Sequence, residues 1–145
     1  MTIARHLDII DLLRVRAFPA ERGRSGVVTS GPGYHLAELR TSEDFLDDGG
    51  SRRTEVAEQY EAECEALAVL LGERWGVADM FSLAGVLIRG MEGEEIPEPW
   101  YELSNSIPYL RIWRREGRWI AVGVAQWDTE LAFRLVTVVT EVDPP

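Results

Sequence analysis

Few side chains in this sequence are of the kinds that perform chemistry, and their spacing matches no catalytic motif. The two histidines, His6 and His35, are not paired in a spacing such as HxxxH, and Cys64 is the single cysteine. Metal sites and activated nucleophiles need several such groups close together. The sequence therefore predicts no catalytic residue, no metal site and no cofactor. His35, which follows Gly-Pro-Gly-Tyr, is the best polar candidate if the protein is an enzyme.

An arginine- and tryptophan-rich stretch, LRIWRREGRWIAV at residues 110–122, is the strongest signal for binding. It places four arginines around Trp113 and Trp119. Arginines beside aromatic rings can stack on a nucleic-acid base, a flat ligand or a partner side chain. Which of these applies depends on how the two predicted strands pair.

The turn between these strands decides which side chains share a face. A turn of two residues would set Arg115 opposite Arg118 and would mix charged and apolar residues on both faces. A loop of three residues, 115–117, pairs Trp113 with Trp119 and makes one face uniformly apolar. Because a slip of one residue moves every side chain to the other face, we predict the three-residue loop. The other expected pairs are Ile112 with Ile120, Leu110 with Val122, Val124 with Phe133, and Val122 with Leu135.

This register predicts an inner, apolar face and an outer face that could bind. The inner face would hold Leu110, Ile112, Ile120, Val122, Val124, Phe133, Leu135 and Val139. The outer face would hold Tyr109, Arg111, Trp113, Trp119, Ala121, Gly123, Arg134 and Val136. Aromatic rings can bury roughly 150–250 Å² each. The alternative is a cross-strand tryptophan pair worth under about 1 kcal/mol of sheet stability, or a face that another element covers. The predicted binding residues here are Tyr109, Arg111, Trp113, Trp119 and Arg134.

A second candidate surface is the acidic segment from Met91 to Glu102, MEGEEIPEPWYE. Charged residues around aromatic anchors are typical of protein-binding segments. Trp100 and Tyr101 therefore join the predicted binding residues. The alternative is a solvated connector, and the three prolines of residues 95–108 predict an extended, largely exposed chain there.

The elements that must position these residues follow from apolar periodicity. Residues 3–17 and 54–75 repeat apolar side chains every three or four positions, which predicts two helices. Residues 80–89 and 108–142 predict one strand and a three-stranded meander. Residues 18–53 are rich in glycine and polar residues, and we expect one or two short strands or a mobile functional segment there. The fold class is α+β, with an antiparallel sheet of four or more strands packed on the 54–75 helix in one domain, 1–145.

Charge limits the partners that the protein can have. The 145 residues carry a net charge of −10, and all fifteen basic residues are arginine. Residues 41–107 contain four arginines and sixteen acidic residues, −12. Such a surface repels nucleic acid and anionic membranes. The N-terminus does not resemble a signal peptide and no apolar run is long enough to cross a bilayer, so we expect a cytoplasmic protein.

Three functions are compatible with these features. The first is a small acidic interaction module that regulates or neutralises a protein partner, a basic one in particular. The second is a small-molecule-binding protein or enzyme, with a pocket between the sheet and residues 18–53 in which His35 and nearby carboxylates supply the polar groups. The third is a structural protein that forms homo-oligomers, such as a homodimer, through the tryptophan face.

Overall fold

The computed structural model describes residues 3–44, 51–126 and 131–145. Over these ranges the chain forms four helices and seven strands. The helices are α1 (Ile3–Val15), α2 (Ser51–Trp75), α3 (Ala84–Met91) and α4 (Trp100–Ser104). The strands are β1 (Gly23–Ser25), β2 (Val28–Gly31), β3 (Tyr34–Thr41), β4 (Asp79–Ser82), β5 (Tyr109–Arg115), β6 (Arg118–Ala125) and β7 (Arg134–Thr140).

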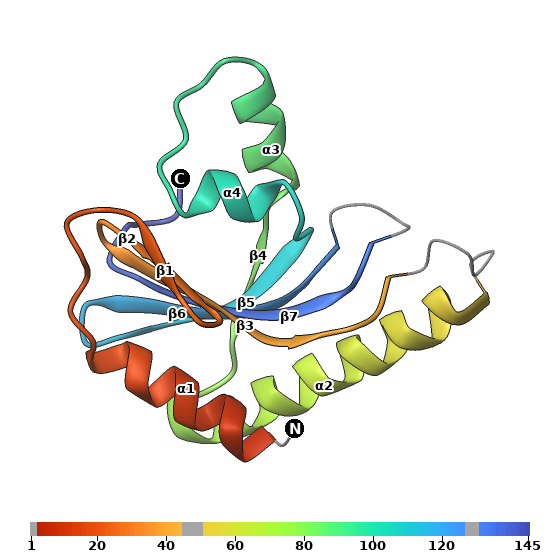
Figure 1. Cartoon of the computed structure of the whole chain (residues 1–145). Coiled ribbons are helices and arrows are strands. Elements are labelled where there is room, and N and C mark those ends of the chain that lie inside the picture. The colour runs from red at the N-terminus through yellow and green to blue at the C-terminus, as the bar shows by residue number, and fades with distance from the viewer. Residues whose placement is uncertain (1–2, 45–50, 127–130) are drawn as a thin grey trace.

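These strands form a single antiparallel sheet in the order β1-β2-β3-β7-β6-β5-β4. Helices α1 and α2 cross one face of the sheet, and α3 and α4 lie on the other (Figure 1). The predicted α+β class is confirmed, with its N-terminal helix, its long helix and its C-terminal meander. The segment 18–53 contributes three strands, one more than we expected at most, and its strand β3 pairs with β7 in the middle of the sheet.

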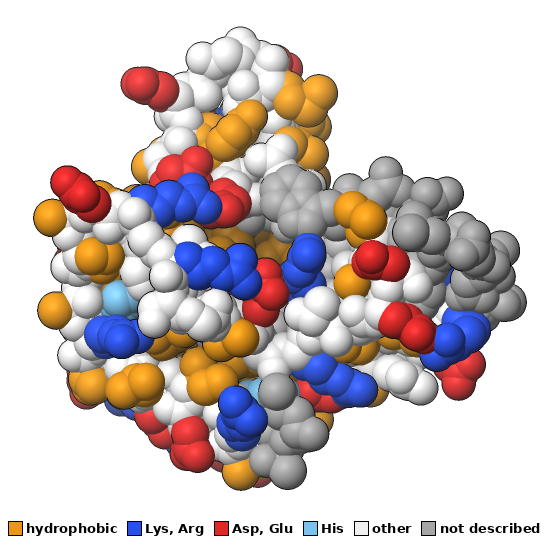
Figure 2. Space-filling model, in the orientation of Figure 1, with side chains coloured by type: hydrophobic (Ala, Val, Ile, Leu, Met, Phe, Trp, Pro, Cys, Tyr) orange, Lys and Arg blue, Asp and Glu red, His pale blue; other side chains and the backbone are white. Residues whose placement is uncertain are grey.

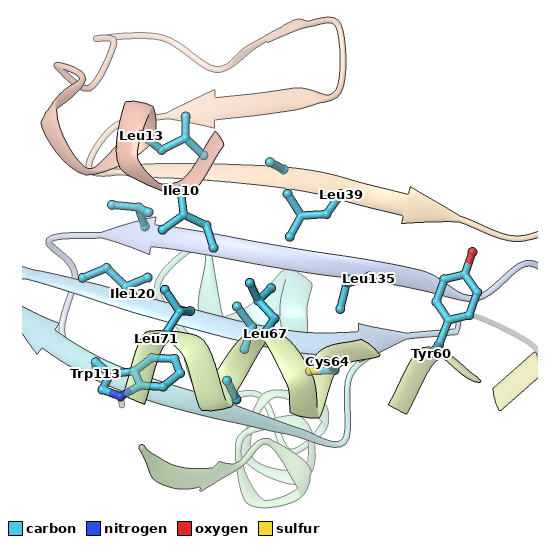
Figure 3. Close-up of a cluster of buried hydrophobic side chains, with 14 of the residues drawn as sticks. Ile10, Leu13, Leu39, Tyr60, Cys64, Leu67, Leu71, Trp113, Ile120 and Leu135 are labelled. Atoms are coloured by element: carbon cyan, nitrogen blue, oxygen red, sulfur yellow. The ribbon is translucent and has the colours of Figure 1, made fainter. Parts of the chain in front are cut away.

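The first core lies between the sheet and helices α1 and α2. Helix α2 has apolar residues three or four positions apart, so that they line one side of the helix and reach the sheet. Its most buried positions include Val56, Tyr60, Cys64, Leu67 and Leu71. Figure 3 shows these side chains, except Val56, meeting Ile10, Leu13, Leu39, Trp113, Ile120 and Leu135. The predicted packing of the long helix on an apolar sheet face is therefore confirmed.

A second core lies on the opposite face, so the alternative that another element covers this face is the one that occurs. Trp100 at the start of α4 has no exposed surface, and its indole Nε1–H donates to the Val142 carbonyl at 3.0 Å. The Phe81 ring meets it edge-on, with 5.7 Å between ring centroids. The buried residues around it are Leu83, Val86, Leu103, Ile107, Leu110, Ile112, Ala121, Ala125, Val136 and Val138. Both faces of the sheet are thus covered.

Two predicted elements are wrong. Residues 80–89 are not one strand, because β4 ends at Ser82 and helix α3 follows. Leu83 and Val86, three positions apart, are the buried residues there, which is a helical spacing. Residues 95–108 are not an extended exposed chain, because they contain α4. Pro97 and Pro99 precede α4 and Pro108 follows it, so no proline interrupts the hydrogen bonds of this helix.

The predicted hairpin register is also wrong. Strands β5 and β6 join through a two-residue turn that pairs Trp113 with Ile120, Arg114 with Trp119 and Arg115 with Arg118. Arg115 and Arg118 are like charges set opposite each other, which argued against this register, but their surroundings relieve the repulsion. Arg118 donates to the carbonyls of Leu13 and Arg16, at 3.0 and 2.7 Å, and Arg115 is exposed to solvent. Side chains of β5 are therefore on the opposite faces from those predicted.

The β6–β7 register is shifted by two residues from the prediction. Val124 pairs with Leu135 and Val122 with Thr137, in place of Phe133 and Leu135. A shift of two keeps every side chain on its face, so the faces predicted for β6 and β7 are correct. The turn that we placed at residues 128–129 lies outside the described residues.

The two-residue turn makes a specific prediction about Glu116. Glu116 and Gly117 both have positive φ, 55° and 80°, as a type I′ turn requires. Asparagine tolerates this conformation better than glutamate, so Glu116→Asn should raise the free energy of unfolding by about 0.5–1 kcal/mol. Urea denaturation followed by circular dichroism measures the change. Glu116→Gln is the control, since it removes the same charge without favouring positive φ. Equal effects of the two substitutions would contradict the turn.

Candidate functional site

The seven predicted binding residues do not form one surface. Tyr109, Arg111 and Trp113 point toward α2, whereas Trp119 and Arg134 lie on the face that α3 and α4 share. Trp100 is buried in the second core, and its neighbour Tyr101 is 38% exposed. The platform of two opposed tryptophans is therefore a wrong prediction, since the register on which it depended does not occur.

The two tryptophans of the arginine-rich stretch have different surroundings. Trp113 is 5% exposed beneath α2, where its Nε1–H donates to the Gly76 carbonyl at 2.8 Å and its ring meets Trp75 edge-on. Trp119 is only half-buried. Its Nε1–H donates to Asp143 at 3.0 Å, and the Arg114 guanidinium lies 5.1 Å from the ring centroid. Trp113 is a core residue, and Trp119 retains some exposed surface.

Arg111 and Tyr109 tie strand β5 to α2. Arg111 donates to the Glu65 carboxylate at 2.6 Å and to the Cys64 sulfur at 3.2 Å, and the Tyr109 hydroxyl donates to Glu61 at 3.1 Å. Burial raises the pKa of the Cys64 thiol to about 11. A thiol that stays protonated at neutral pH is a poor nucleophile.

A groove between α2 and β4 brings together exposed apolar side chains and carboxylates. We call it the α2–β4 groove, and it has a volume of about 560 Å³. Its lining residues are Glu65, Ala68, Val69, Gly72, Glu73, Val77, Ala78, Met80 and Arg111. Among these, Val69, Val77 and Met80 are 54%, 97% and 61% exposed. Large exposed apolar side chains gathered at a hollow are typical of a binding surface.

Two carboxylates also line this groove. Glu65 is bound by Arg111, but Glu73 on α2 is exposed and forms no ion pair within the described parts of the chain. Asp79 on β4 is exposed as well, but it pairs with Ile112 and therefore points to the other face of the sheet. β4 is also an edge strand, so one side of its backbone is not paired within the sheet. Such edges are frequent sites of strand addition by a partner.

Sequence reasoning missed this groove, although one signal for it was present. Val69 lies on α2 but away from the buried positions Leu67 and Leu71, so it is an apolar residue on the polar side of an amphipathic helix. Val77 and Met80 carried no such signal, because Met80 fell at the start of the strand predicted for residues 80–89 and Val77 preceded it.

His35 lies on β3, within the sheet and near the end of α1. It lines a cavity of about 320 Å³ together with Ser30, Arg16, Glu21 and other residues. The ring is nevertheless 1% exposed. Nε2–H donates to the Arg16 carbonyl at 3.2 Å, so Nδ1 accepts the Ser30 hydroxyl at 2.6 Å. Burial lowers the pKa of His35, and the neutral ring therefore predominates at pH 7.

Within the described ranges, no three His, Cys, Asp or Glu side chains gather as metal ligands. No helix in the same ranges is both long and apolar enough to cross a membrane. No protein-family model, curated protein or solved structure matches this chain.

Proposed function

We propose that this protein is an acidic interaction module that binds a basic partner protein through the α2–β4 groove. The observation that carries the proposal is the grouping of Val69, Val77 and Met80 beside the carboxylate of Glu73, which forms no ion pair within the described residues. Apolar side chains supply affinity when they are buried, and carboxylates at the rim attract arginines or lysines of the partner. The net charge of −10 favours the same class of partner.

The free edge of β4 suggests how the partner binds. An extended segment that pairs with this strand would gain backbone hydrogen bonds along the edge. Its apolar side chains would enter the groove next to Met80, and its basic side chains would meet the rim. Such binding would neutralise or regulate the partner, and it fits a cytoplasmic role.

Charge reversal at the rim tests this proposal. Tagged protein is used to capture partners from a lysate of the source organism, as wild type and as the variant Glu73→Arg. The control is Glu92→Arg, which changes the net charge equally at an exposed carboxylate after α3. We expect a basic protein that the wild type and the control retain, and that the rim variant loses by at least about tenfold at low salt.

A second pair of variants tests the contribution of apolar contacts to binding separately from that of charge. Met80→Ser should weaken capture, whereas Met91→Ser, at a methionine on α3 that is 75% exposed, should not. Equal capture by all variants, or no partner at low or moderate salt, would contradict the proposal. A protein that sediments as a dimer, and dissociates in the Met80→Ser variant, would instead favour self-association through this groove.

The second candidate function is small-molecule binding, with or without catalysis, in a pocket between the sheet and residues 18–53. The position of two cavities favours it. One is lined by His35, and the other by Arg134 together with residues of β1 and β2. Both lie on the side of the molecule away from the α2–β4 groove, so the two functions can be tested separately.

A further inference from the structure

A serine and a histidine that are hydrogen-bonded to each other line the cavity beside the β1–β2 hairpin. Strands β2 and β3 pair Ser30 directly opposite His35, so the two side chains lie on the same face of the sheet. The Ser30 hydroxyl donates to Nδ1 of His35 at 2.6 Å, and Nε2–H of the ring donates to the Arg16 carbonyl at 3.2 Å. Hydrogen bonds therefore connect a hydroxyl, a base and a third group that orients the base.

These contacts are the ones that activate a serine as a nucleophile. A serine attacks a carbonyl readily only when a nearby base takes its proton, and that base must be held in the right tautomer. The Arg16 carbonyl keeps a proton on Nε2 of His35, which leaves the lone pair of Nδ1 facing the Ser30 hydroxyl. Burial lowers the pKa of His35, so the ring is neutral and able to accept this proton at pH 7.

The accessibility of the two side chains suits these roles. Ser30 is partly exposed and lines the cavity of about 320 Å³, whereas His35 is buried and needs to contact only the serine. Strand β1, which borders this cavity, is the edge of the sheet, and its three residues are exposed. A substrate that enters beside the hairpin therefore meets the serine and leaves the contacts of the histidine ring intact.

The other walls of the cavity fit a small carbonyl compound. Ala17, Pro19 and Val28 supply apolar surface, and Arg16 and Arg24 supply positive charge. Figure 2 shows arginine side chains on the surface around the β1–β2 hairpin. Positive groups stabilise the negative oxygen that forms when a nucleophile attacks a carbonyl. The volume of about 320 Å³ lies at the lower end of the range for pockets that bind small molecules.

We propose that Ser30 and His35 form a catalytic dyad that hydrolyses a small carboxylic ester in this cavity. Ser30 Oγ attacks the ester carbonyl carbon and gives its proton to Nδ1 of His35, which passes it to the leaving alcohol oxygen as the ester bond breaks. Water then attacks the acyl group on Oγ. His35 takes a proton from this water and returns it to Oγ as the carboxylic acid leaves. The inference rests on the second candidate function and is independent of the α2–β4 groove.

Covalent labelling of the wild-type protein tests for the nucleophile. Diisopropyl fluorophosphate phosphorylates activated serines with loss of fluoride, and mass spectrometry of proteolytic fragments locates the added group. We expect an adduct on Ser30 that forms at least about 100-fold faster than any on Ser25, which lines the same cavity from β1. The absence of an adduct on Ser30, or equal labelling of Ser25, would overturn the proposal.

Hydrolysis of p-nitrophenyl acetate, followed by the release of p-nitrophenol, tests for turnover. Ser30→Ala and His35→Gln should each lower kcat/KM by at least about 100-fold, whereas Ser25→Ala should not change it. Thermal unfolding establishes which variants are folded. If His35→Gln does not fold, Ser30→Ala and the labelling of the wild type decide the question. Unchanged turnover in folded Ser30→Ala protein would overturn the proposal.

The pH dependence of turnover distinguishes a catalytic histidine from a structural one. Wild-type kcat/KM should stay constant from pH 8 to below pH 6.5, and should then fall as His35 takes up a proton, because its pKa is lowered. Arg16 and Arg118, the charges that act on the ring, do not titrate in this range. Glu21 also lines the cavity, and Glu21→Gln should keep the same profile.

A kcat/KM that rises in proportion to hydroxide over this whole range would overturn the role of His35. The groove variant Glu73→Arg should hydrolyse the ester at the wild-type rate. Failure of the groove proposal would therefore leave this result intact, and failure of the dyad would leave the groove proposal intact.

Discussion

Replacing Trp113 by alanine should lower the free energy of unfolding by about 3–5 kcal/mol, because it empties a large, well-packed site beneath α2. Trp113 is 5% exposed, packs against Trp75 and donates a hydrogen bond to Gly76. The indole hydrogen bond links β5 to the segment that ends α2. Its loss leaves the Gly76 carbonyl without this donor and adds to the cost of the cavity.

Trp119→Ala is the matched control for this substitution. Trp119 is half-buried, and its indole hydrogen bond goes to Asp143, whose side chain is 74% exposed. We expect this substitution to cost about 1 kcal/mol. Urea unfolding of both variants, followed by circular dichroism, gives the comparison. Two tryptophans paired on an open face would give equal and small effects, each under about 1 kcal/mol, and such a result would contradict the structure.

Acid should destabilise the protein below pH 6.5 through His35. The pKa of His35 is lowered from 6.5 because the ring is buried, and the nearby charges of Arg118 and Arg16 lower it further, against the hydrogen bond to the Arg16 carbonyl. The unfolded chain takes up a proton below pH 6.5, while the folded ring stays neutral. Stability is therefore complete above pH 6.5 and falls by up to about 1.4 kcal/mol per pH unit as the pH approaches the folded pKa.

Urea unfolding at several pH values between 7.5 and 5 measures this slope. His35→Gln cannot titrate and should show a smaller slope, although it is less stable at pH 7. Ser30→Ala keeps the buried ring and should keep the slope. The ionisation of Glu63 does not contribute to the slope that is assigned to His35. Burial would raise the pKa of Glu63, but hydrogen bonds from His6 and Arg40 lower it from 4.5, so its contribution is lost only at lower pH. Equal slopes in wild type and His35→Gln would contradict this account.

The sequence predicted those parts of the fold that depend on local periodicity. Apolar spacing located α2 from Val56 to Leu71, and the alternation within β6 and β7 placed Ile120, Val122 and Leu135 on the correct face. These signals are strong because each element buries one side against a single neighbour.

Prediction failed where distant parts of the chain determine the local environment. The register of β5 was judged by uniform apolarity, but Arg111 is accommodated on an otherwise apolar face because Glu65 of α2 binds it. Arg118 is accommodated because it reaches the carbonyls at the end of α1. No local pattern shows these partners. The α2–β4 groove was missed for the same reason, since it combines residues from α2, β4, β5 and the segment between α2 and β4.

The pairing of β3 with β7 has a consequence for how the protein folds. These two strands lie near opposite ends of the sequence, about one hundred residues apart, yet together they form the middle of the sheet. During synthesis, β3 has only the short β1–β2 hairpin beside it until β7 is made. Contacts so far apart in sequence slow folding. Until β7 is in place, the exposed edge of β3 is therefore the part of the nascent chain that most needs protection from aggregation.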